Sequence, residues 1–143
     1  MESRISLKFE KITPTQTQID ELFFLIKSRK YSISRKSVPT KKEHSNFVFN
    51  HPYRIWYLIY KNKNLAGSIY IHKDNSIGID LLEFNKNDVF LTIKFIKDNY
   101  KPLQSIQSVR NKEFFINVAP NNKQLIRILK NFNKIEIQRS FFV

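Results

Sequence analysis

Three side chains that can move protons fall close together in the sequence, at Tyr70, His72 and Asp80. A positioned carboxylate is a common general base, and imidazole and phenol groups also transfer protons. Asp80 is the best candidate base because it falls inside a predicted strand, where partial burial raises the pKa of a carboxyl. A solvated carboxylate, or one paired with a lysine, is the alternative for Asp80. A surface position at a strand end is the alternative for His72.

Basic side chains upstream form a second candidate set. The segment Arg29–Pro39 lacks periodicity and is predicted to be a loop, and its Arg29 and Arg35 suit the phosphates of a cofactor or sugar nucleotide. His44 falls on the apolar stripe of a predicted helix. A solvated basic loop and a half-buried, hydrogen-bonded histidine are the alternative interpretations. The three histidines are too scattered to predict a metal site.

The composition limits the classes of function. The chain has 143 residues, 41% of them apolar, which favours one folded domain over residues 1–143. There is no cysteine, so disulfides, thiolate metal sites and a cysteine nucleophile are excluded. The net charge of +13 favours anionic partners, although a nucleic-acid-binding module would be expected to interleave basic and aromatic residues, which this chain does not do. No signal peptide or membrane-spanning run is seen, so a cytoplasmic protein is expected.

Three consecutive strands are predicted to position the candidate acid–base groups, over Arg54–Lys61, Leu65–His72 and Ser76–Leu82. Alternation places Tyr70 and His72 on one face of the second strand. It places Gly78, Asp80 and Leu82 together on one face of the third. The two glycines of the chain both fall inside these strands, which predicts a bulge or a close approach of another group.

The remaining elements follow from capping and apolar spacing. The predicted order is β-α-α-β-β-β-α-β-α-β, an α/β fold with a single mixed sheet flanked by helices. The elements outside the three strands are a strand at Ile5–Lys11, a helix from Thr13-Pro14 to Ser28, a helix begun by Thr40, a helix capped by Asn87 or Asp88 and ending near Asn99, a central strand at Glu113–Val118, a helix at Lys123–Phe132 and a last strand or hairpin at Ile135–Val143.

Several segments in this order resemble the GNAT superfamily of N-acetyltransferases. Val118–Leu129 is similar to the family's pattern of a valine, three residues, an asparagine and then an apolar-spaced helix. Leu65–Ile69 resembles the family's hairpin strand on the cofactor side, where a glycine commonly follows the turn, and Ser76–Leu81 resembles the strand that leads into the cofactor loop. Thr40–His44 followed by Phe47 is similar to the second helix of members that acetylate amino groups on nucleotide-linked sugars.

The resemblance implies transfer of an acetyl group from acetyl-CoA to a primary amine. It implies that Leu81 and Leu82 pair with the pantetheine arm and that Asn122 binds the cofactor. The backbone amides of Asn87, Asp88 and Val89 would meet the pyrophosphate at a helix N-terminus. The amine would enter between Asp80 and the loop that carries Arg29 and Arg35, with His44 near the acceptor.

Two departures from the family pattern leave alternatives open. Glu83–Phe90 contains no glycine where the family has a glycine-rich phosphate loop, and Asp88 adds a negative charge there. Leu129 stands where many members carry a proton-donating tyrosine. A non-catalytic binding or regulatory protein with the same fold is therefore one alternative. The net charge of +13 leaves a nucleic-acid-binding module as another. The apolar segment Ile135–Val143 predicts an open sheet edge and hence a homodimer.

Overall fold

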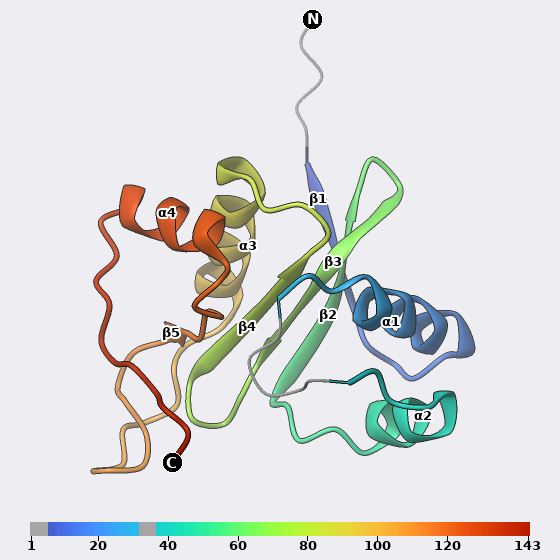
Figure 1. Cartoon of the computed structure of the whole chain (residues 1–143), viewed down its shortest axis with the longest axis horizontal. Coiled ribbons are helices and arrows are strands. Elements are labelled where there is room, and N and C mark those ends of the chain that lie inside the picture. Colours follow the sequence, from blue (N-terminus) through green and yellow to red (C-terminus); the bar gives the residue numbers. More distant parts are fainter. Residues whose placement is uncertain (1–5, 32–36) are drawn as a thin grey trace, which may run out of the picture.

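The computed structural model describes residues 6–31 and 37–143 and contains a five-stranded mixed sheet (Figure 1). Its strands lie side by side in chain order, antiparallel from β1 to β4, whereas β5 is parallel to β4. The strands are β1 (Leu7–Lys11), β2 (Ile55–Lys61), β3 (Asn64–Ile71), β4 (Ser76–Leu81) and β5 (Phe115–Ile116). The three central strands thus agree with the sequence prediction to within one residue at each end.

In the described part of the chain four helices flank the sheet, and each begins at a side-chain cap. They are α1 (Gln16–Ser28), α2 (Lys41–Phe49), α3 (Lys86–Asn99) and α4 (Lys123–Asn131). The capping box at Thr40 is confirmed. Two predicted starts are wrong: Thr15 caps α1 rather than Thr13, and Asn85 caps α3 rather than Asn87 or Asp88. Both true caps place a side-chain oxygen on the third amide that follows, a bond that the predicted positions do not form.

The described residues form two apolar cores, one on each face of the sheet. Figure 1 shows α3 and α4 on one side of the sheet and α1 and α2 on the other. One face packs against α3 and α4 through residues such as Ile69, Ile77 and Leu81. The other packs against α1 and α2 through Trp56 and Leu58. The alternation predicted from the sequence is confirmed. Asp80 therefore lies on the face that is covered by α1.

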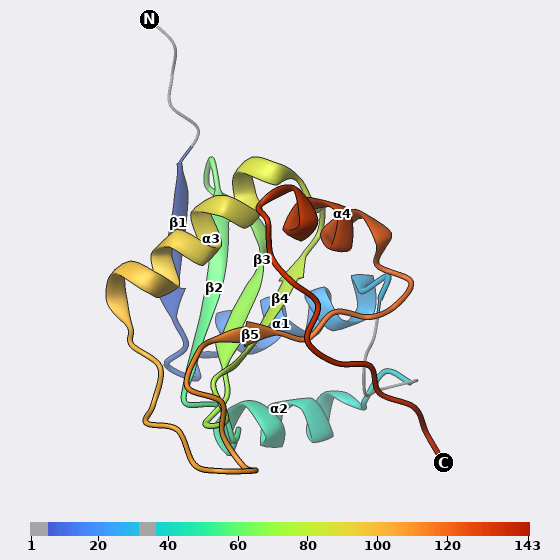
Figure 2. The same ribbon diagram turned by 90° about the vertical axis from the view of Figure 1, so that its left-hand side faces the viewer.

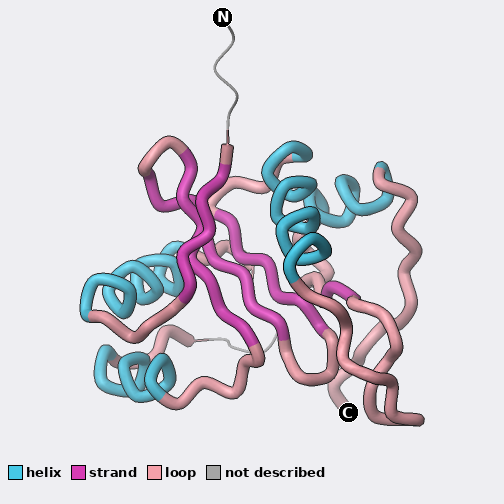
Figure 3. The backbone as a smooth tube through the Cα atoms, turned by 180° about the vertical axis from the view of Figure 1, so that it is seen from behind, coloured by secondary structure: helices cyan, strands magenta, loops and turns pink. Residues whose placement is uncertain are grey.

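The last third of the chain differs from the prediction. The segment predicted as a central strand forms only β5, two residues long and at the edge of the sheet. Its neighbours Phe114 and Val118 are apolar because they pack against the core on the α3 and α4 side, not because sheet surrounds them. The predicted final strand is absent: after α4 the chain runs as a loop with exposed side chains (Figure 3). The observed order is β-α-α-β-β-β-α-β-α.

Candidate active site

A groove opens where β4 and β5 stop pairing. The two strands pair only at Ser76 with Phe115 and Ile77 with Ile116, after which β4 continues to Leu81 alone. The chain beyond β5 turns away toward α4 (Figures 1 and 2). The groove has a volume of about 140 Å³. Its walls are the last residue of α1 with the residues that follow it (Ser28–Tyr31), Tyr70 of β3, the strand and loop Gly78–Phe84, and the segment from Asn117 to Leu125.

Backbone groups of β4 face this groove without a strand partner. The His72 amide donates to Ser76 O, and the Leu82 amide donates to Ala66 O. Hydrogen-bonded pairs alternate along antiparallel strands, so the even-numbered residues of β4 bond to β3. The N–H and C=O groups of Ile79 and Leu81 therefore point to the opposite edge. No strand of the described residues pairs with them there.

Asp80 and Arg29 meet in the groove although 51 residues separate them. Arg29 is the C-cap residue of α1, and its Nε and Nη2 atoms lie 3.3 and 3.2 Å from Asp80 Oδ2. The Asp80 side chain is 16% exposed and that of Arg29 is 31% exposed. Burial raises the pKa of the Asp80 carboxyl above its ordinary value, and the Arg29 guanidinium opposes that rise. The prediction that Asp80 is a partly buried strand carboxylate is confirmed; its role as a base stays a prediction.

The Tyr70 side chain lies over Gly78 of β4 and lines the same groove. It is paired with Gly78 on the neighbouring strand, and a Cβ atom built on Gly78 would lie 2.0 Å from Tyr70 Cζ. Glycine at this position is what lets the phenol ring lie over β4. The ring also stacks on Tyr53, with centroids 4.1 Å apart. Burial raises the pKa of the Tyr70 hydroxyl above its ordinary value, so the group is protonated at neutral pH.

The two candidate histidines do not line the groove. His72 follows β3 and its ring packs against Tyr53 and Tyr70, outside the groove lining. His44 is buried between α2 and α1, where its Nε2 lies 2.9 Å from the carbonyl oxygen of Ile19. The structure thus favours a packing role for both histidines. Arg35 lies outside the described residues.

The predicted cofactor residues separate into two groups. Leu81, Leu82 and Asn122 line the groove. Leu81 offers its backbone there, whereas the Leu82 amide is already bonded to Ala66. Asn122 is buried at the start of α4, and its Oδ1 accepts the Leu125 amide at 3.3 Å. Its cap oxygen is thereby engaged, which leaves the side-chain Nδ2 as the group that a ligand in the groove would meet.

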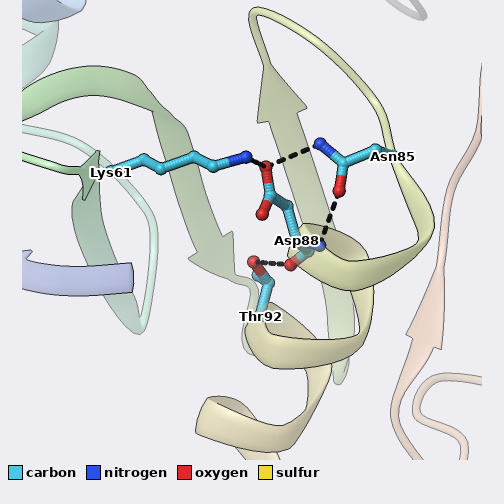
Figure 4. Close-up of polar contacts among 4 residues, drawn as sticks. All are labelled: Lys61, Asn85, Asp88 and Thr92. Carbon is cyan, nitrogen blue, oxygen red and sulfur yellow. Dashed lines mark hydrogen bonds and ion pairs between the residues drawn. The ribbon is translucent and has the colours of Figure 1, made fainter. Parts of the chain in front are cut away.

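Asn87, Asp88 and Val89 belong to the first turn of α3 and do not line the groove. Val89 is fully buried in the core. The Asp88 carboxylate turns toward β2, where its Oδ2 lies 3.0 Å from Lys61 Nζ and 2.7 Å from Asn85 Nδ2 (Figure 4). The expectation that Asp88 presents a free charge to a ligand is therefore wrong. Its charge is held inside the protein by Lys61 and Asn85.

Sequence reasoning missed several groove residues, among them Tyr31, Phe84 and Gln124. Tyr31 follows the end of α1 and meets the Phe84 ring edge to face. Both are partly or fully buried aromatics in segments predicted as polar loops. The sequence signal for these residues is an aromatic side chain inside a basic or polar loop, because such a side chain usually packs against other apolar groups.

Solved structures of similar shape share this fold, although no protein-family model and no curated protein sequence matches the chain. A domain from Methanocaldococcus jannaschii aligns at a TM-score of 0.67 and 16% identity, over 96% of this chain and 93% of that one. The aminoglycoside N-acetyltransferase AAC(6')-Iy, solved in complex with CoA, aligns at 0.59 and 9%, over 100% and 97%. A probable acetyltransferase from meticillin-resistant Staphylococcus aureus aligns at 0.52 and 13%, over 96% and 98%.

The chain therefore has the GNAT acetyltransferase fold, as its sequence motifs predicted. At these identities the likeness defines the fold, and the chemistry has to be argued from the groove. Among the described residues, no three potential metal ligands cluster. No helix in that part of the chain is long and apolar enough to cross a membrane.

Proposed function

We propose that this chain transfers an acetyl group from acetyl-CoA to a primary amine. The observation that carries the proposal is the groove beside β4, where unpaired strand groups and a partly buried carboxylate lie together. The acetyltransferases of the same fold support it. Acetyl-CoA supplies the activated acetyl group as a thioester.

The groove fits the extended part of this cofactor. Its pantetheine arm carries amide groups, and the backbone groups of Ile79 and Leu81 face the groove as a strand edge that can bond to amides. The Asn122 side chain lies on the opposite wall. For the phosphates, the amides of Lys86 and Asn87 in the first turn of α3 would be the binding groups, and the Lys86 ammonium adds positive charge.

The acceptor side is formed by Asp80. A primary amine is an ammonium ion at neutral pH and has to lose a proton before its nitrogen can attack. The Asp80 carboxylate is suited to take that proton because burial raises its pKa. Tyr70, on the same face, offers a hydroxyl as the nearby proton donor. An amino sugar on a nucleotide carrier, suggested by the sequence of α2, is one acceptor to be tested.

The test is release of free thiol from acetyl-CoA with a panel of primary amines. The chain has no cysteine, so a thiol reagent reports the released CoA without background from the protein. We expect turnover that is lost in Asp80→Asn. Calorimetry with CoA runs in parallel. No binding at millimolar CoA would refute the proposal, whereas binding without turnover of any amine would favour a non-catalytic role for the same groove.

A further inference from the structure

The contact between Arg29 and Asp80 uses only one oxygen of the carboxylate. Arg29 Nε and Nη2 both donate to Oδ2, at 3.3 and 3.2 Å. In the usual arginine–carboxylate pair, two parallel bonds engage both oxygens. Here Oδ1 accepts no hydrogen bond, and Nη1 donates none, among the described residues. Each partner of the ion pair therefore keeps one polar atom for a ligand.

Among the described residues, the charges on the groove wall balance, unlike those of the chain as a whole. The described residues that line the groove include two cations, Arg29 and Lys30, and two carboxylates, Asp80 and Glu83. The whole chain has a net charge of +13. A phosphorylated acceptor would bring a charge of about −2, which this wall does not neutralise. A ligand with one positive and one negative group matches it.

We infer that the acceptor is an amino acid or another short aminocarboxylic acid. Its ammonium would meet Asp80 Oδ1, and its carboxylate would meet the free Nη1 edge of Arg29. The planar guanidinium fork suits a carboxylate. This inference names the acceptor class of the proposed acetyl transfer and rests on that proposal. Arg29 is then a specificity-determining residue.

The test compares matched acceptors that differ only by the carboxylate, such as tyrosine with tyramine and lysine with cadaverine. We expect kcat/KM to be about tenfold to a hundredfold higher for the acids, which corresponds to one charged hydrogen-bonded contact of ~1.5–3 kcal/mol. In Arg29→Gln this preference should fall to within about threefold, mainly through loss with the acids. Lys27→Gln, which removes the same charge from the same helix outside the groove, should keep the preference.

A binding measurement separates this inference from the proposed function. Tyrosine and tyramine are titrated calorimetrically into wild type and Arg29→Gln without acetyl-CoA. Equal kcat/KM for acids and amines would overturn the inference and leave acetyl transfer intact. A higher kcat/KM for phosphorylated amines than for the aminocarboxylic acids would likewise overturn the inference and leave acetyl transfer intact. If no acceptor is acetylated, acetyl transfer fails. Binding of tyrosine to the wild type but not to Arg29→Gln would then still support the site, and equal or absent binding would overturn it.

Discussion

Lys61 Nζ lies 3.0 Å from Asp88 Oδ2 and joins the end of β2 to the first turn of α3. The Asp88 side chain is 6% exposed, and its other oxygen, Oδ1, has no hydrogen-bond partner among the described residues. Asn85 caps the same turn and also donates to Oδ2 (Figure 4). The charge beside the predicted phosphate site is therefore compensated within the protein, and it fixes where α3 begins.

Replacing Lys61 with Met should destabilise the fold by about 2–4 kcal/mol, because it leaves a buried carboxylate without its cation. Asp88→Asn should cost less, since the amide oxygen still accepts from Asn85. The double variant should recover part of the loss of Lys61→Met. Urea unfolding measures all three, with the exposed Lys73→Met as the control. Equal stability of Lys61→Met and Lys73→Met would show that the ion pair contributes nothing.

The central strands could be predicted from the sequence because the pattern that defines them lies within each strand. Alternation along Leu65–His72 and Ser76–Leu82 fixes the face of each side chain, and the structure confirms it. The same alternation places Asp80 inside a predicted strand, which is why it is the best candidate base. At Gly78 the sequence predicts a close approach of another group to the strand. It does not predict that this group is the Tyr70 ring, which the structure shows.

The features that were missed depend on pairs far apart in sequence. No local pattern shows that Arg29 meets Asp80, or that Lys61 turns Asp88 away from a ligand. The strand or hairpin predicted at Ile135–Val143 is wrong because an apolar segment indicates only what the chain can form there. Whether it forms a strand depends on a partner edge, which is set by tertiary structure.

The two glycines should differ in their response to alanine. A Cβ on Gly67 would lie 2.1 Å from the backbone oxygen of Asp80, which cannot move without breaking the strand pairing. We expect a loss of roughly 3 kcal/mol for Gly67→Ala. At Gly78 the obstacle is the end of the Tyr70 side chain, so about 1–2 kcal/mol is expected.

A double-mutant cycle checks the second half of this prediction. Gly78→Ala combined with Tyr70→Ala should be no less stable than Tyr70→Ala alone, because the obstacle is gone. Thermal or urea unfolding supplies the values. Additive losses in the cycle would mean that the strand, and not the ring, requires glycine at this position.

The chain should form a dimer through the segment after α4. Ile135, Ile137 and Phe141 are 85%, 62% and 82% exposed, an unusual concentration of apolar surface. The outer edge of β5 has no partner strand among the described residues. A second copy that covers both features would bury them. Sedimentation at micromolar concentration should show a dimer, and Ile135→Ser/Ile137→Ser/Phe141→Ser should be a folded monomer. A monomeric wild type would refute the prediction.

The pH dependence of acetyl transfer should report the Arg29–Asp80 pair. The active form of Asp80 is the carboxylate, so kcat/KM should rise with pH through the pKa of Asp80 in the free enzyme. Burial places that pKa above the ordinary carboxyl value of 3.8, and Arg29 holds it down. In Arg29→Gln the opposing positive charge is lost, so the inflection should move to higher pH. Lys27→Gln serves as the control, since Lys27 does not contact Asp80.

The same pair predicts how stability changes with pH. A carboxyl whose pKa is raised in the folded state stabilises the fold fully below its unfolded pKa, and that stabilisation is lost as pH rises through the folded pKa. Arg29 limits this loss by favouring the charged form. Arg29→Gln should therefore cost more stability at neutral pH than at pH values below the ordinary carboxyl range. Urea unfolding of wild type, Arg29→Gln and Arg29→Gln/Asp80→Asn across pH measures this. A stability difference between wild type and Arg29→Gln that is independent of pH would show that the guanidinium does not act on the Asp80 charge.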